Sequence, residues 1–242
     1  HRDLHSFPTR RSSDLRCLSL FGWALLWLVS GCGLAENHYL LIDQSLAAHD
    51  PRRADAIMAQ AESEYGQRNR LLYSMDRGMT LHLAGDYAQS NNLLEQAAVE
   101  VERLYTRSIR TETAAFLTND NMLPFEGDPY EHVMINVVKA LNYAAMGQLT
   151  EAVVEARQID HRLNVLSDSA KDKDGYREDA FARYLTGVLY ESTGDLNNAF
   201  IAYRKAYETY EATKGWSRTP MPPMLRADLL RTTDALHMTT EF

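Results

Sequence analysis

The chain has 242 residues, of which 25 are Lys or Arg and 33 are Asp or Glu, so its net charge is −8. Because 45% of the residues are hydrophobic, the composition is that of a globular protein and excludes a disordered chain. Nucleic-acid-binding proteins use an excess of Lys and Arg to displace phosphate counterions, so this acidic balance predicts no nucleic-acid partner. Two cysteines are too few for a disulfide framework or an all-cysteine metal site.

The N-terminal residues show no pattern that would make them part of the fold. Residues 1–15 show neither helical nor strand periodicity, and we expect them to be a non-native leader. After Arg16 comes an uncharged apolar run from Cys17 to Val29. A helix that spans a bilayer needs about 20 apolar residues, so this run is too short to do so. It is typical of the hydrophobic part of a signal peptide, which we place at residues 16–31.

The apolar run ends in Val-Ser-Gly-Cys at residues 29–32. Small residues before a cysteine resemble the lipobox of bacterial lipoproteins, which implies cleavage before Cys32 and acylation of its thiol and new amine. Several acyl chains hold a protein on a bilayer because each buried CH₂ contributes about 0.8 kcal/mol. The next residue is Gly33 rather than the Asp that resembles an inner-membrane signal, which implies the periplasmic face of the outer membrane. The alternative is an ordinary secretory signal or an N-terminal apolar helix.

Residues 32–242 read as one helical domain. Apolar residues recur at intervals of three and four, as in Ile57, Ala61 and Tyr65, whereas alternating strand patterns are almost absent. Asp-Pro pairs at 50–51 and 128–129 offer an N-cap followed by proline at the first helical position. The second pair precedes Glu131, which resembles a capping box. We therefore predict an all-α fold.

A spacing of small residues repeats three times. In each copy a small residue is followed seven residues later by glycine and five residues after that by another small residue. The first small residue lets the two helices of a pair approach closely, and the glycine ends the leading helix in a left-handed conformation. The second small residue lies where the two helices cross. The copies are Gly78, Gly85 and Ser90; Ala140, Gly147 and Ala152; and Gly187, Gly194 and Ala199.

This spacing resembles the tetratricopeptide repeat, which implies antiparallel helix pairs stacked as a right-handed superhelix. The predicted repeat cores cover about 70–104, 131–166 and 178–213. The turn glycines Gly85, Gly147 and Gly194 are 62 and then 47 residues apart. A regular array would place them about 34 residues apart, so we expect insertions between the pairs.

Most of residues 65–237 also resembles an uncharacterised family of bacterial tetratricopeptide lipoproteins. Members of that family are longer, so the resemblance implies that the C-terminus is truncated here. The segments that carry the resemblance are Arg77-Gly78, Gly85-Asp86-Tyr87, Leu-Thr-Asn-Asp-Asn at 117–121, and Glu-Asp-Ala-Phe-Ala-Arg-Tyr at 178–184.

The longest polar insertion runs from Phe116 to Tyr130 and holds an Asn-Asp-Asn triplet. Loops of this length in helical arrays are often functional, and an aromatic residue beside polar groups suits a partner. The alternative is a packed connector whose polar side chains satisfy turn backbone. The candidate partner-binding residues are Asn119, Asp120, Asn121, Phe125, Tyr130, Arg183 and Tyr184.

The sequence carries no recognised catalytic or metal motif. No histidine pair has metal-ligand spacing, and Gly-x-Ser-x-Gly, phosphate-binding and dinucleotide motifs are absent. We therefore predict no enzyme, no cofactor and no metal, but a scaffold that holds an envelope protein or peptide in a concave groove. The alternative is a cell-wall-active hydrolase that uses carboxylates of the loop from Asn119 to Asp128, namely Asp120, Glu126 and Asp128.

Overall fold

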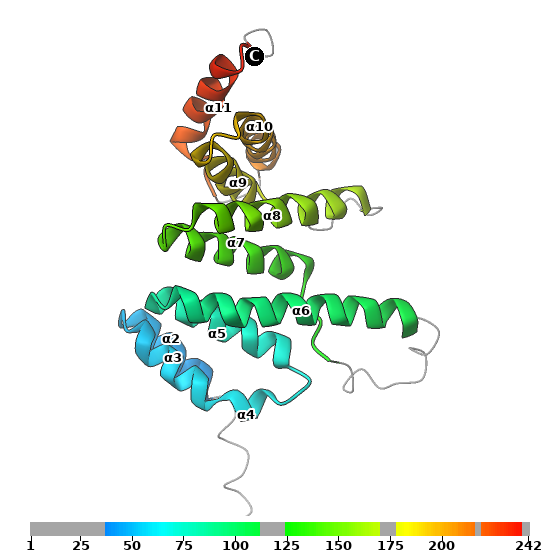
Figure 1. The fold of residues 1–242 in the computed structure, drawn as a ribbon. Helices are drawn as coiled ribbons and strands as arrows, with labels where there is room; N and C mark the ends of the chain where they lie inside the picture. The colour runs from blue at the N-terminus through cyan, green and yellow to red at the C-terminus, as the bar shows by residue number, and fades with distance from the viewer. Residues whose placement is uncertain (1–36, 112–123, 170–177, 216–218, 239–242) are drawn as a thin grey trace, which may run out of the picture.

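The computed structural model describes residues 37–111, 124–169, 178–215 and 219–238. Over these ranges the chain forms ten helices and no strand, which confirms the all-α prediction. Helices that are neighbours in sequence also pack as neighbours in space. Figure 1 shows the resulting row, which begins at α2 and α3 and ends at α11.

Each of the three sequence repeats forms a pair of helices joined by a short turn. Turns of two or three residues reverse the chain, so the two helices of each pair run in opposite directions. The pairs are α5 (Arg70–Ala84) with α6 (Tyr87–Thr111), α7 (Pro129–Ala145) with α8 (Leu149–Ser169), and α9 (Ala180–Ser192) with α10 (Leu196–Thr213). Before them come α2 (Asn37–Ala47), α3 (Pro51–Gln60) and α4 (Glu62–Tyr65), and after them α11 (Pro223–Ala235).

Local signals set the ends of these helices as predicted. The three turn glycines Gly85, Gly147 and Gly194 have φ values of +80°, +73° and +83°, the left-handed conformation that glycine adopts without a Cβ clash. At the start of α3 the Asp50 carboxylate accepts the backbone N–H of Arg53 at 3.0 Å. Before α7 the backbone N–H of Asp128 donates to the Glu131 carboxylate at 2.7 Å. These short-range contacts explain why the pairs begin and end where they do.

The two helices of a pair approach closely at the small residues. Ser90, Ala152 and Ala199 are all fully buried at 0% exposure. The Ser90 hydroxyl donates to the backbone oxygen of Gly78 at 2.7 Å, which joins α6 to α5. A Cβ added to Gly187 would lie 2.4 Å from Cδ1 of Tyr203, so α9 has no room for a larger residue there.

The buried apolar residues form three clusters along the row. One lies among α2 to α5 and includes Ile42 and Met58. A second joins α5, α6 and one side of α7. The third runs from α7 to α11. Helix α7 contributes to two of them, with Ile135 in the second and Val137 in the third, so it connects the two halves of the row.

No helix in the described ranges is both long and apolar enough to cross a membrane.

Replacing Gly187 by Ala should destabilise the protein, although alanine favours a helix by about 0.5–1 kcal/mol over glycine. The new Cβ meets the ring of Tyr203 within α10, and overpacking of this kind costs about 1–3 kcal/mol. Thermal unfolding followed by circular dichroism should show a lower Tm. Gly215→Ala is the matched control, since nothing lies within 4 Å of a Cβ at that position. A Gly187→Ala protein as stable as the wild type would mean that the crossing is not tight.

Candidate functional site

The predicted site residues divide into those that the structure describes and those that it does not. Cys32 and the triplet from Asn119 to Asn121 lie outside the described residues. The other four candidates are described, and they lie at two separate junctions of the row. Phe125 and Tyr130 lie at the entry to α7, whereas the neighbouring residues Arg183 and Tyr184 lie in α9.

At the entry to α7, Phe125 is half-buried and packs against the cluster formed by α5, α6 and α7. Its backbone N–H donates to the backbone oxygen of Arg68 at 3.0 Å, which holds the segment against the residues before α5. Phe125 therefore fills the gap between two helix pairs. Tyr130, in the first turn of α7, is 45% exposed.

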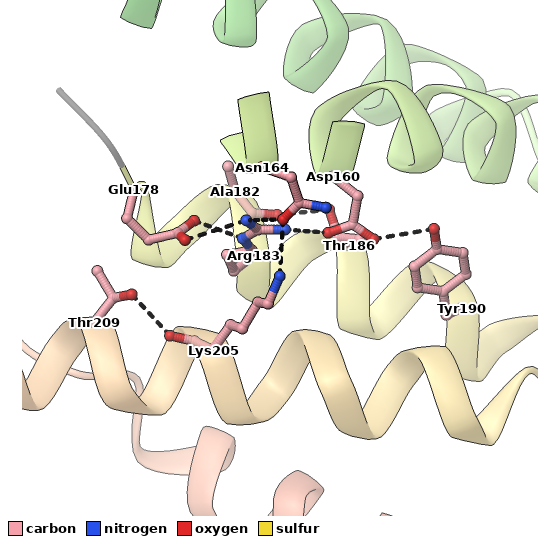
Figure 2. Close-up of polar contacts among 9 residues, drawn as sticks. All are labelled: Asp160, Asn164, Glu178, Ala182, Arg183, Thr186, Tyr190, Lys205 and Thr209. Atoms are coloured by element: carbon pink, nitrogen blue, oxygen red, sulfur yellow. Dashed lines mark hydrogen bonds and ion pairs between the residues drawn. The ribbon is translucent and has the colours of Figure 1, made fainter. Parts of the chain in front are cut away.

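Arg183 is fully buried, and its donors are engaged within the chain (Figure 2). Its Nε and Nη2 donate to the two oxygens of Glu178 at 2.5 and 3.1 Å. Nη2 also donates to Oδ1 of Asn164 at 2.9 Å, and Nη1 donates to Asp160. One buried guanidinium thus joins α9 to α8, and its charge is balanced by two carboxylates.

Two further residues complete this group, which we call the Arg183 cluster (Figure 2). Lys205 of α10 donates from Nζ to Oδ1 of Asn164 at 2.8 Å. The hydroxyl of Tyr190 donates to the second oxygen of Asp160 at 3.1 Å. Burial raises the pKa of Tyr190, and the nearby Asp160 carboxylate raises it further, so the phenol stays protonated as a donor. The cluster therefore holds α8, α9 and α10 together.

Tyr184 makes the corresponding connection from α9 to α11. Its hydroxyl donates to Oδ2 of Asp228 at 2.7 Å. Burial, and then this hydrogen bond, raises the pKa of Tyr184 to about 12. Arg231 lies 2.8 Å from Asp228 and 2.7 Å from Glu191, and the Tyr203 hydroxyl also donates to Glu191 at 2.7 Å. These contacts tie the last helix to the pair before it.

A second buried cation, which the sequence did not single out, lies between α6 and α8. Lys139 of α7 is only 5% exposed, and its Nζ lies 2.6 Å from Glu95 and 2.9 Å from Glu155. Burial alone would lower the pKa of Lys139, but the bonds to the two carboxylates outweigh it and the net pKa is raised. Asn136 donates to Glu155 at 2.8 Å and accepts from Nε of Arg162 at 3.0 Å. We call this group the Lys139 cluster.

A group of amide, hydroxyl and imidazole side chains occupies the junction of α5, α6 and α7. Asn142 is 0% exposed, and its amide nitrogen donates to Oγ of Ser90 and to Oδ1 of Asn91, both at 2.8 Å. Its oxygen lies 2.6 Å from Nδ1 of His82, which must donate because the amide oxygen only accepts. This group, the Asn142 cluster, joins three helices through one side chain.

The structure also contains a groove that no sequence pattern indicated. Helices α6 and α8 extend past the start of α7, which otherwise separates them (Figure 1). Their C-terminal halves and the first turn of α7 enclose a groove of about 600 Å³. Its apolar lining residues include Val101, Leu104 and Tyr105 of α6, Pro129 of α7, and Val165 and Leu166 of α8.

Solvent reaches the apolar walls of this groove, and polar groups lie at its rim. Tyr105 is 65% exposed and Val165 is 50% exposed. Arg162 and Glu102 form an ion pair across the groove at 3.1 Å. His132 in the groove lies 2.8 Å from the backbone oxygen of Glu126, so its Nε2 carries the proton and donates. An open apolar surface with a polar rim suits a protein segment.

Comparison with known proteins adds no relatives: no protein-family model, no curated protein and no solved structure matches the chain. Within the part of the chain that the structure describes, no group of three or more His, Cys, Asp or Glu side chains could hold a metal ion. The groove between α6 and α8 is therefore the feature from which a function is inferred.

Proposed function

We propose that this chain is a lipid-anchored scaffold on the periplasmic face of the bacterial outer membrane. In this proposal Cys32 carries the acyl chains, and the helix pairs stack as a tetratricopeptide-like right-handed superhelix with insertions. The groove between α6 and α8 binds a helix or an extended segment of an envelope protein. The observation that carries the proposal is the exposed apolar lining of that groove, with Tyr105 and Val165 on opposite walls.

The spacing of α6 and α8 supports a helical occupant. Helix α7 packs on both α6 and α8, and packed helices lie about 8–10 Å apart. Before the start of α7 at Pro129, no part of α7 lies between the two longer helices. The space between them there is about as wide as one helix. An amphipathic segment can place its apolar face between the walls and its polar face beside Arg162 and Glu102.

Nothing in the described residues favours the hydrolase alternative over the scaffold. Glu126 and Asp128 are both exposed, and Asp128 uses its backbone in the turn that begins α7. A pair of catalytic carboxylates needs environments that separate an acid from a base, and two solvated side chains supply no such difference.

The membrane anchor is tested at Cys32. Cys32→Ala should abolish palmitate labelling and leave the protein uncleaved or in the soluble periplasmic fraction, because no thiol remains to be acylated. Cys17→Ala is the matched control, since it changes the other cysteine of the chain inside the apolar run and should keep the label. Palmitate that persists on the Cys32→Ala protein would contradict the anchor.

The groove is tested by photo-crosslinking in living cells. A photoreactive residue in place of Tyr105 should form a discrete adduct with an envelope protein, whereas one in place of Val99 should not. Val99 is a fair control because it is 60% exposed on the same helix but does not line the groove.

A second substitution makes the groove test specific. Val165→Asp should remove the Tyr105 adduct by placing a charge on the apolar wall, while Val154→Asp, at an exposed position of α8 outside the groove, should retain it. Equal adducts from positions 99 and 105, in proteins with unchanged Tm, would place the partner elsewhere.

A further inference from the structure

A second hollow, of about 770 Å³, lies where the end of α3, α4, α5 and the first half of α6 meet. Its chemistry differs from that of the groove between α6 and α8. Polar side chains form most of its wall, and they carry amide, hydroxyl, guanidinium and carboxylate groups. Small-molecule sites have volumes of about 300–1,000 Å³, so this hollow, which we call the polar pocket, has the size of a ligand site.

A chain of hydrogen bonds fixes one wall of the polar pocket. Nη1 of Arg77 donates to the hydroxyl of Tyr73 at 3.0 Å, and that hydroxyl donates to Oε2 of Glu62 at 3.3 Å. Nε of Arg77 donates to Oδ1 of Asp55 in α3 at 3.1 Å. The guanidinium is therefore held in place before any ligand arrives, and these bonds leave its Nη2 available.

The charges at the polar pocket balance. Its cations are Arg70 and Arg77, while the carboxylate of Glu62 lines the same wall and Asp55 pairs with Arg77. Two guanidinium groups against two carboxylates give no net charge. An anion in the pocket would lie near Glu62, and placing like charges together is costly. The balance therefore favours a ligand without net charge.

Amide and hydroxyl groups decide the chemistry of that ligand. Gln60, Gln67 and Gln96 line the pocket from α3, from the residue after Gly66 and from α6, and Ser63 and Ser74 add hydroxyls. Each amide and each hydroxyl can both donate and accept a hydrogen bond. A ligand hydroxyl does the same, so a molecule with several hydroxyls can pair with all of these groups. An apolar ligand would leave them without partners, which costs free energy.

We propose that the polar pocket binds a neutral oligosaccharide. In this proposal Arg77 and the glutamine amides hydrogen-bond to the hydroxyls of the sugar, and Leu93 contacts the C–H face of a sugar ring. The inference rests neither on the groove between α6 and α8 nor on the acylation of Cys32. It gives the chain a second binding site of different chemistry, so that one molecule can hold a protein segment and a glycan together.

The test is ligand-detected saturation-transfer NMR on the full chain, kept in a detergent without a sugar headgroup. The probes are neutral trisaccharides of glucose, mannose, galactose or N-acetylglucosamine, each added alone. We expect at least one of them to bind the wild type. The double variant Gln67→Ala, Gln96→Ala should bind that sugar about tenfold more weakly or not at all, because two hydrogen bonds are lost. Both glutamines are exposed, so the fold should be unaffected.

Gln44→Ala, Gln148→Ala is the matched control, since both residues are exposed glutamines that do not line the pocket. It should bind the sugar as the wild type does. Binding that is equal in the two double variants would overturn the site, and a wild type that binds none of the trisaccharides would overturn the proposal. Inorganic phosphate is the charged probe: a phosphate that displaces the bound sugar would contradict the preference for a neutral ligand. None of these outcomes bears on the groove or on the anchor.

Discussion

Buried polar groups that find partners across the junctions between helices fix the row of helices. Lys139 of α7 meets one carboxylate from α6 and another from α8, and Arg183 of α9 meets carboxylate and amide groups at the end of α8. An unpaired buried charge costs several kcal/mol, so a pair of helices that slid or rotated on its neighbour would lose that much. Apolar packing alone holds helices together but tolerates several arrangements. The Asn142 cluster supplies the same specificity through hydrogen bonds of a buried amide.

The groove follows from this fixed order together with unequal helix lengths. Helix α7 has 17 residues, while its neighbours α6 and α8 have 25 and 21. With both neighbours held against α7 by the Lys139 cluster, their C-terminal parts extend past the start of α7 and leave the groove between them. The same row places α2 at one end and α11 at the other (Figure 1). In the proposed scaffold, an anchor at the α2 end would leave the groove in the middle of the row open to a partner.

The sequence predicted the features that depend on neighbouring residues and missed those that depend on distant ones. Left-handed glycines and the cap at Asp50 are local, and they were found where expected. The partners of Lys139 lie 44 residues before it and 16 residues after it, and no local pattern links them. One signal was available, because each copy has a buried polar residue four positions before its first small residue: Ser74, Asn136 and Arg183. The groove depends on the space that α6 and α8 leave between them before α7 begins, and the spacing of the repeats does not give that arrangement.

Hydrogen exchange of an Arg183→Met protein tests most directly whether buried polar groups fix the junctions. Methionine keeps an apolar stem but leaves Asp160 and Glu178 without their shared partner. In a row where each pair contacts only its neighbours, the loss should stay local. We expect amides of α9, α10 and α11 to exchange faster while those of α5 and α6 keep the protection of the wild type. Unchanged protection in α9 to α11, or an equal loss in every helix, would contradict the account.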